Sequence, residues 1–514
     1  MSLLGFFGVA CLIILLIKSY FSKTATNTSG LPYPPGPKSL PVIGNLLDVP
    51  KSESWKTYGS WGKQYGELVH FTVFGQHYIV INSMRVAVDL LEKRSKTYSD
   101  RPEIPMLEVI GWDWNTGVMP YGAAWRQRRR EIHQQFRTEK ALQYHPTIMK
   151  EAHQFLNKLL LTPDKFASHI RHYPGAVIMS VVYDYEVASA DDHFLNIAEE
   201  AISMLSVATF PGATLVNTFP WLQYLPSWLP GMGFKQHAER CRRLTAEMKG
   251  APLQYVRDRI ASGAPTRCVA TEVLSRLSDP MGQTTPEAEE VIKDVVAIAY
   301  AAGADTTVSA ITTGFLAMLL YPEAKKKAQQ EIDTIVGSDR LPTLHDRASL
   351  PYVEAFVWEV LRWHPVLPLS VARAAYDNDI YEGKFIPKEA TILMNTWAIH
   401  HDEGMYPEPE VFKPERFLGP DGSLKDEYPM TAFGIGRRIC PGRHAADASL
   451  WVAVTLVLAA FDVRKRKDES GREIDVSDEF TDSLISHPVG FVCDIQPRNP
   501  RTESIIREAV MCRE

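Results

Sequence analysis

The sequence has little of what would assign it to several common protein classes. Its 514 residues include six cysteines without regular spacing, so we predict no disulfide framework. It contains no glycine-rich fingerprint for a flavin or nicotinamide, and its histidines, including His400 and His401, lack metal-site spacing. No linker, repeat or low-complexity tract follows residue 41, and a formal net charge of −6 argues against nucleic acid as a partner. One folded domain over residues 41–514 is therefore predicted.

The N-terminus differs from the rest of the chain. Residues 3–17 are uncharged and almost wholly apolar, and with residues 19–21 the run approaches the ~20 residues that span a bilayer. We predict a transmembrane anchor over residues 1–22. The alternative, a cleaved signal peptide, lacks a positive n-region and a clear cleavage site. Lys18 and Lys23 place the downstream chain in the cytosol, which leaves the sequon at Asn27 unglycosylated.

Residues 23–40 contain the stiff sequence LPYPPGP, which cannot continue a helix, and we predict a proline-rich hinge there.

Hydrophobic periodicity predicts a mainly α fold with a small β-rich part. Helices are expected over residues 85–93, 123–136, 144–161, 190–206, 235–260, 285–336 and 353–363. A β-hairpin is expected over residues 68–74 and 77–81, with short strands over 370–374, 380–381 and 391–395. The stretch 292–320 has almost no polar residues outside Lys293, Asp294 and positions 305–307, so we expect it to be buried through the middle of the domain.

The decapeptide FGIGRRICPG, from Phe433 to Gly442, gives one cysteine the surroundings of a thiolate metal ligand. Three glycines allow tight turns and close approach to a flat partner, and two arginines near Cys440 favour its anionic form. A run of helix formers after Ala445 puts the sulfur just ahead of a helix N-terminus, which also favours the thiolate. The alternative is a buried free cysteine in a glycine-rich turn.

Pro441 has no backbone N–H, so hydrogen bonds to the Cys440 sulfur must come from residues such as Gly442 and Arg443.

A second candidate element is AGADTT, residues 302–307, within the long apolar helix. Gly303 removes side-chain bulk and threonine hydroxyls compete for backbone carbonyls, which together could open a notch against a flat cofactor. Asp305 and Thr306 there form a candidate proton relay. The alternative is a helix bent at Gly303, with Asp305 satisfied by a neighbouring side chain.

Glu359 and Arg362 lie at i and i+3 among large apolar residues, so we expect a buried ion pair on one helix face. Buried pairs need further hydrogen bonds, and Arg416 in the sequence PERF supplies another donor.

Two basic runs have different interpretations. Trp125 and Arg129 share a helix face at i and i+4. Arg126, Arg128 and Arg130 are either a solvated basic face or in part a docking site for an acidic flavoprotein. Residues 325–327, three lysines, are expected to be solvated surface.

These elements resemble those of the cytochrome P450 family, the haem-thiolate monooxygenases. The spacing F-x-x-G-x-R-x-C-x-G is similar to its haem-binding signature, and AGADTT, E-x-x-R, P-E-R-F and W-x-x-x-R follow its order. The resemblance implies the cytochrome P450 fold, with haem b bound through Cys440 and the decapeptide residues Phe433, Gly434 and Gly442. It also implies that Trp125, Arg129, Arg373 and Arg438 bind the haem propionates.

By the same resemblance, Thr306 hydrogen-bonds dioxygen and Asp305 helps to deliver protons, whereas Glu359, Arg362 and Arg416 form a structural triad. The implied enzyme is a monooxygenase of the endoplasmic reticulum membrane that inserts one oxygen atom from O2. Its electrons would come from NADPH through a cytochrome P450 reductase, with cytochrome b5 as a second candidate donor.

The predicted substrate pocket is mostly apolar and indicates a hydrophobic small molecule. By analogy with the family its walls include Met106, Ile110, Trp112, Ala304, Ser370, Val371 and Leu484. The sequence resembles fungal, basidiomycete-type members of secondary metabolism, which favours terpenoid hydroxylation.

Several alternatives stay open. An indole, a polyketide or a xenobiotic aromatic compound could be the substrate. A haem-thiolate isomerase or dehydrase, a haem sensor or carrier, and a protein without haem are the other classes.

Overall fold

The structure is a computed structural model that describes residues 27, 29–188, 191–209 and 215–511, without the side chains of 206–209. The predicted anchor over residues 1–22 and the start of the hinge lie outside these residues. The described chain divides into two compact units. The first contains residues up to 103, 367–407 and 434–439, and the second contains residues 104–366, 408–433 and those from 440 onwards.

The first unit is built on a β-hairpin. Strands β1 (Leu68–Val73) and β2 (Gln76–Ile81) pair antiparallel, with Val73 opposite Gln76. Phe74 and Gly75 form the turn, both with positive φ, as two-residue hairpin turns require. The predicted hairpin is confirmed, with its turn one residue earlier than expected.

The sheet of the first unit has the order β1-β2-β6-β3, with β6 parallel to β2 and β3 antiparallel to β6. The remaining elements of the first unit are β3 (Arg373–Ala374), β4 (Asp379–Tyr381), β5 (Lys384–Ile386), β6 (Thr391–Met394), α2 (Ser54–Tyr65), α3 (Met84–Ala87) and α16 (Thr396–His400). Strands β4 and β5 pair with each other in a separate sheet. A π-helical segment, Val88–Lys93, continues α3. The strand predicted over 370–374 is shorter because Ser370 has a φ of 56°, which no strand residue adopts.

The second unit is mainly helical. Its helices are α4 (Pro105–Val109), α5 (Ala123–Phe136), α6 (Thr138–Ala141), α7 (His145–Leu161), α8 (Phe166–Tyr183), α9 (His193–Thr209), α10 (Leu215–Thr218), α11 (Phe234–Ala261), α12 (Val269–Leu277), α13 (Pro286–Leu320), α14 (Pro322–Ile335), α15 (Pro351–Trp363), α17 (Arg443–Ala460) and α18 (Pro500–Met511). Strands β7 (Phe461–Lys465) and β8 (Cys493–Pro497) pair antiparallel. The predicted helices at α5, α7, α9, α11 and α15 are confirmed within one turn.

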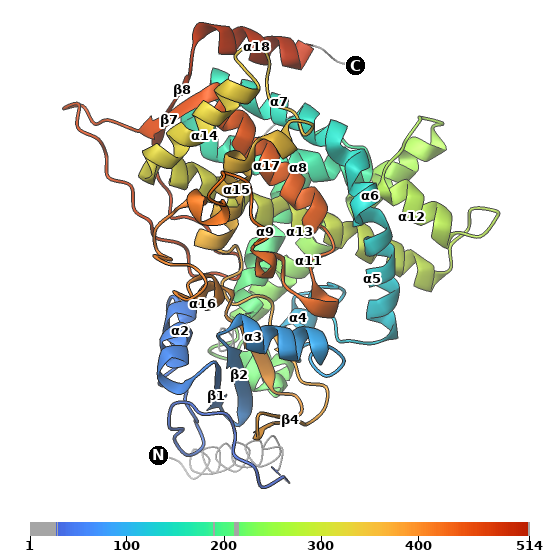
Figure 1. The fold of residues 1–514 in the computed structure, drawn as a ribbon. Coiled ribbons are helices and arrows are strands. Elements are labelled where there is room, and N and C mark those ends of the chain that lie inside the picture. The colour runs from blue at the N-terminus through green and yellow to red at the C-terminus, as the bar shows by residue number, and fades with distance from the viewer. Residues whose placement is uncertain (1–26, 28, 189–190, 210–214, 512–514) are drawn as a thin grey trace. The chain divides into compact units, whose positions relative to one another are not determined.

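Helix α13 is the central element of the second unit. It packs against α8 and α17, and α7 in turn packs against both of those helices (Figure 1). Within the described part of the chain only α13 is long and apolar enough to cross a membrane. However, 61% of its most apolar 18-residue stretch is buried, as in a core helix. The predicted burial is confirmed.

The single helix predicted over residues 285–336 is wrong. Thr285 caps the start of α13 by accepting the Ala288 N–H at 3.2 Å, and α13 ends at Leu320. Pro322 cannot donate to the preceding turn and disfavours helical backbone at Tyr321, so a separate helix, α14, begins there.

The prediction of a solvated lysine run is also wrong in part. Lys325 is 8% exposed, and its Nζ donates to Asp462 Oδ1 at 2.8 Å and to the Val463 carbonyl at 2.7 Å. It therefore joins α14 to β7, whereas Lys326 and Lys327 are exposed.

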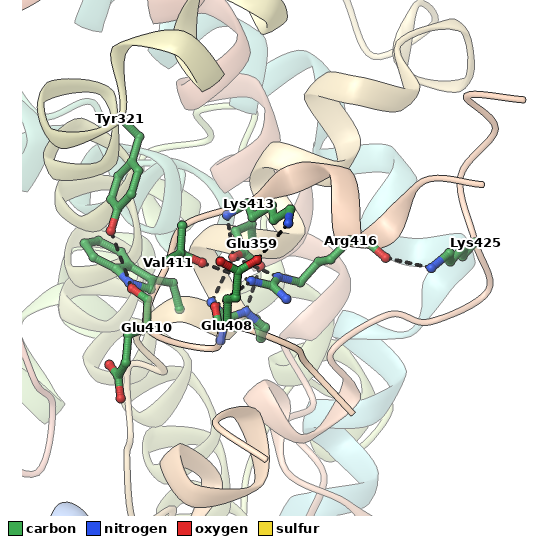
Figure 2. Close-up of polar contacts among 10 residues, drawn as sticks. Tyr321, Glu359, Glu408, Glu410, Val411, Lys413, Arg416 and Lys425 are labelled. Carbon is green, nitrogen blue, oxygen red and sulfur yellow. Dashed lines mark hydrogen bonds and ion pairs between the residues drawn. The ribbon is translucent and has the colours of Figure 1, made fainter. Parts of the chain in front are cut away.

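Glu359 on α15 is the centre of a buried polar network (Figure 2). Its Oε2 accepts from Arg362 Nε at 2.7 Å, and its Oε1 accepts from Arg416 Nε at 3.1 Å and from the Lys413 N–H at 2.8 Å. The side chains of Glu359 and Arg362 have no exposed surface. The structure thus brings the predicted triad together and supplies the further hydrogen bonds that a buried ion pair needs.

The network also ties down the segment that precedes the PERF sequence. Arg416 Nη2 donates to the Glu408 carbonyl at 3.1 Å and to the Val411 carbonyl at 3.0 Å. The Glu408 side chain, in contrast, forms an exposed ion pair with Lys413 at 3.0 Å (Figure 2).

We expect Glu359→Gln to lower the free energy of unfolding by about 3–5 kcal/mol, because two buried guanidinium groups lose their counterion. Glu408→Gln is the matched control, since its pair is exposed and should contribute less than about 1 kcal/mol. Chemical denaturation of both variants measures the difference. Equal effects would show that the buried charge is not what stabilises this region.

Candidate active site

The Cys440 loop of the second unit leads directly into α17. Gly442 is the residue before the helix, so the cysteine lies just ahead of a helix N-terminus, as predicted. The Cys440 N–H donates to the Phe433 carbonyl at 2.8 Å, which fixes the turn. The backbone N–H groups of Gly442 and Arg443 act on the sulfur to lower the pKa of the thiol, in agreement with the inference from Pro441.

Cys440 is half-buried, and its sulfur lies in an electropositive environment. Burial raises the pKa of the Cys440 thiol, and the two N–H groups together with the charges of Arg129 and Arg443 act against that rise. Burial likewise lowers the pKa of Arg129, and the charge of Cys440 opposes the decrease. Bound metal ions displace the proton of a coordinating thiol, so this loop is suited to hold a metal through its sulfur.

The part of the decapeptide in the first unit needs glycine at two positions. Gly434 and Gly436 have φ values of 69° and 64°, which disfavour residues with a side chain. A Cβ on Gly436 would also lie 2.0 Å from the Leu91 carbonyl oxygen. The close approach at Gly436 is therefore to the backbone of the π-helical segment.

The middle of α13 is more open than the buried stretches on either side of it. Ala302 is exposed, and Ala299 and Thr306 are half-buried, which marks one accessible stripe at helical spacing. The first turn of α17 is half-buried as well, although the helix is buried from Ala448 onwards. Both stretches are therefore less completely covered than the neighbouring turns of the same helices.

Gly303 has a different role from the one predicted. A Cβ there would meet the Ile178 side chain of α8 at 3.0 Å, so the missing side chain allows α8 to pack closely against α13. The Thr306 hydroxyl donates to the Ala302 carbonyl at 2.9 Å, which is the backbone competition expected of a helical threonine.

Asp305 has a specific partner. Its Oδ2 lies 3.3 Å from Nε2 of His487, and each side chain is 22% exposed. The alternative interpretation, in which a neighbour satisfies Asp305, therefore describes the observed contact. Sequence reasoning missed His487, because 182 residues separate it from Asp305.

The residues of α5 that the sequence analysis singled out lie in different surroundings. Trp125 is buried and its indole N–H donates to the Thr116 carbonyl at 3.1 Å. Arg128 is not part of a solvated basic face, because it donates to Asp294 of α13 at 2.6 Å. Arg126 and Arg130 are exposed.

Asp294 is 2% exposed and also lies 2.6 Å from Lys249 Nζ of α11. This buried carboxylate thus joins α5, α11 and α13.

The first unit contains a cluster of arginines with a shortage of anions, formed by Arg101, Arg373 and Arg438. Burial lowers the pKa of Arg101, and the charges of Arg438 and Arg373 lower it further. Burial also lowers the pKa of Arg373 to about 10. The buried atoms Arg101 Nε and Arg373 Nη1 have no hydrogen-bond partner in the described structure.

Arg373 and Arg438 were predicted from the family resemblance, but Arg101 was missed because no pattern in the sequence marks it. Arg101 donates to the carbonyls of Val371 and Ala372, Arg373 to that of Ile435 and Arg438 to that of Ser99. Guanidinium groups bind carboxylates through paired hydrogen bonds, so a carboxylate-bearing ligand fits this cluster.

The predicted pocket walls are distributed over both units. Met106, Ile110 and Trp112 are 2% exposed or less, and Ala304 is 8% exposed; these four belong to the hydrophobic core of the second unit, and Leu484 is half-buried. Ser370 and Val371 are half-buried in the first unit. Their role as pocket walls stays a prediction.

Comparison with known proteins identifies the metal-containing group that suits the Cys440 loop. The family model described as cytochrome P450 matches residues 34–491. The chain belongs to the cytochrome P450 family. Its members hold haem through a cysteine thiolate, which the Cys440 loop suits, and the carboxylates of haem suit the arginine cluster.

Three relatives of this cytochrome P450 come from basidiomycete fungi and are named as monooxygenases. Cytochrome P450 monooxygenase 208 of Postia placenta is 40% identical over 97% of this chain and 96% of its own length. Cytochrome P450 monooxygenase COX1 of Coprinopsis cinerea is 39% identical over 96% and 98%, and monooxygenase ple1 of Rhodocybe pseudopiperita is 38% identical over 92% and 91%. The chain is a cytochrome P450 monooxygenase.

Replacing Arg373 with methionine should release haem about tenfold faster, because a carboxylate loses one charge-assisted hydrogen bond worth ~1.5 kcal/mol. Haem transfer to an excess of a haem-free globin measures the rate. Arg85→Met is the control, since Arg85 pairs with Glu67 and Glu382 at the surface. A rate unchanged in Arg373→Met would contradict the proposed carboxylate contact.

Proposed function

We propose that this cytochrome P450 monooxygenase hydroxylates a hydrophobic small molecule, a terpenoid of fungal secondary metabolism. The observation that carries the proposal is the Cys440 loop, in which two N–H groups and two arginine charges surround one thiol ahead of α17. A thiolate in such a loop can hold haem iron and donate electron density to it.

Haem b would be held by Cys440 through its iron, beside Phe433, Gly434 and Gly442. Its propionates would be bound by arginines. The candidates are the buried Arg101 and Arg373 and the half-buried Arg438 and Arg129. When bound, haem supplies the activation of O2 that protein side chains cannot provide.

The chain's own residues would then manage protons. Asp305 and Thr306 lie in the accessible middle of α13, and a carboxyl group beside a hydroxyl can pass a proton inward. Each turnover consumes two protons, because RH + O2 + 2 e⁻ + 2 H⁺ gives ROH + H2O.

Two features support an apolar substrate. The residues around the middle of α13 are small or aliphatic, as at Ala299, Ala302 and Ile178. Polar pockets for charged substrates usually present a fixed counter-charge, and the predicted walls contain none. The terpenoid assignment rests on the likeness to basidiomycete monooxygenases.

Electrons would come from NADPH through a membrane-bound cytochrome P450 reductase, with cytochrome b5 as a second donor. Arg126 and Arg130 on α5 are exposed and suited to an acidic partner surface. Arg128 is excluded from that surface by its pair with Asp294.

The function is tested with Cys440→Ser beside the unchanged chain, each expressed with a reductase in a host that supplies fungal terpene scaffolds. The unchanged chain should show the Soret shift of a thiolate-bound haem when reduced under carbon monoxide, and should form a product that depends on NADPH. Cys440→Ser should lose both, because a hydroxyl is a poor iron ligand. Product formed without NADPH would contradict a monooxygenase, and products only from indole or aromatic substrates would contradict the terpenoid assignment.

We also propose that residues 1–22 anchor the enzyme in the endoplasmic reticulum membrane, with the catalytic part in the cytosol. Removal of these residues should shift most of the protein from the membrane fraction to the supernatant while the carbon monoxide spectrum is retained. A truncated protein that stays fully membrane-bound would contradict this role.

A further inference from the structure

The loop that contains His487 is fixed to α13 by the residue before it. Ser309 of α13 donates its hydroxyl proton to the Ser486 carbonyl, and the Ser486 N–H donates to the Val366 carbonyl at 2.9 Å. The Ser486 hydroxyl lies 2.9 Å from Nε2 of His364. Ser486 is fully buried, so the backbone at His487 has little freedom to move.

His487 itself is held on both sides of its backbone. Its N–H donates to Thr481 Oγ1 at 2.9 Å, and its carbonyl accepts from the Thr481 N–H at 2.7 Å. Asp305 and Ser309 lie four residues apart and thus on one face of α13. The loop therefore contacts this face at two successive turns, through Ser309 and through the Asp305–His487 pair.

Asp305 has a second charged group in its surroundings. Burial raises the pKa of Glu199 on α9, Arg171 of α8 opposes the rise, and the negative charge of Asp305 adds to it. Arg171 Nη1 lies 3.7 Å from Glu199 Oε2, so the arginine pairs with Glu199. Asp305 thus has a further acidic side chain in its surroundings, and His487 is the donor that contacts its Oδ2.

We propose that His487 is a positioning residue for proton delivery. Its Nε2–H donates to Asp305 Oδ2 and holds the carboxylate in the turn that carries Thr306. This inference rests on the proposed function. It assigns a role in the reaction to a residue outside the predicted relay.

The balance of the reaction gives a sensitive readout. Hydroxylation consumes O2, two electrons and two protons for each ROH and H2O formed. The wasteful path, O2 + 2 e⁻ + 2 H⁺ giving H2O2, consumes the same electrons and protons. The ratio of peroxide to product therefore reports where protons are delivered, not how many are available.

His487→Ala should lower product formed per NADPH about tenfold and raise peroxide correspondingly, with KM for the substrate changed less than about twofold. His487→Gln should recover activity to within about threefold, because its amide N–H can donate to the same oxygen. All rates are normalised to the protein that binds carbon monoxide. His193→Ala is the matched control: its Nε2 lies 2.9 Å from Glu247 in an exposed pair, and its loss should change nothing.

A second measurement does not depend on turnover. The imidazole resonance of His487 in histidine-labelled ferrous carbon monoxide protein, assigned by its loss in His487→Gln, should shift in Asp305→Asn and stay unchanged in Glu247→Gln. This resonance tests the His487–Asp305 contact even if His487→Ala does not fold.

The outcomes separate the two proposals. If the unchanged chain lacks the thiolate spectrum and makes no product, the proposed function fails. If it has both but His487→Ala matches it in product and peroxide, or the resonance ignores Asp305→Asn, only the positioning role is overturned.

Discussion

The constraint on which the second unit depends is the burial of α13. A helix of 35 residues extends about 52 Å, and here most of its faces pack against other helices. Every polar side chain on such a helix must find a partner, because an unpaired buried polar group costs about 1–3 kcal/mol. Asp294 finds Arg128 and Lys249, and Ser309 finds the carbonyl of Ser486. These contacts join α5, α11 and the loop before β8 to one helix.

The accessible stripe on α13 is an exception to this burial. Ala299, Ala302 and Thr306 are small, and a packed helix would fill the space beside them with the side chains of its neighbours. Instead Ala302 is exposed at the middle of the helix. This accessible position lies next to a carboxylate and a hydroxyl on adjacent residues, and it is these polar groups, not the apolar stretches on either side of them, that could act on a bound substrate.

How far the sequence could predict the protein depends on the range of the interactions. The Cys440 loop and the Glu359–Arg362 pair are local, so spacing, glycine and proline chemistry predicted the donors to the sulfur and the shared helix face. Helix α8 was missed because Pro174 and Gly175 interrupt its pattern, although burial on most faces compensates for the hydrogen bond that proline lacks. Lys325 was misinterpreted and His487 was missed because their partners, Asp462 and Asp305, lie more than 130 residues away in the sequence. The spacing of residues along the sequence does not show contacts between positions so far apart.

Charge balance links the cofactor to the stability of the fold. The first unit buries Arg101 and Arg373 near the half-buried Arg438, with Asp100 as the one carboxylate whose charge supports Arg101. In the second unit, burial raises the pKa of the Cys440 thiol despite four groups that favour the thiolate. A haem held through the Cys440 thiolate would remove the cost of burying that thiol in the second unit. A ligand that binds only the folded chain stabilises it by mass action, and folding and haem loading should therefore be coupled.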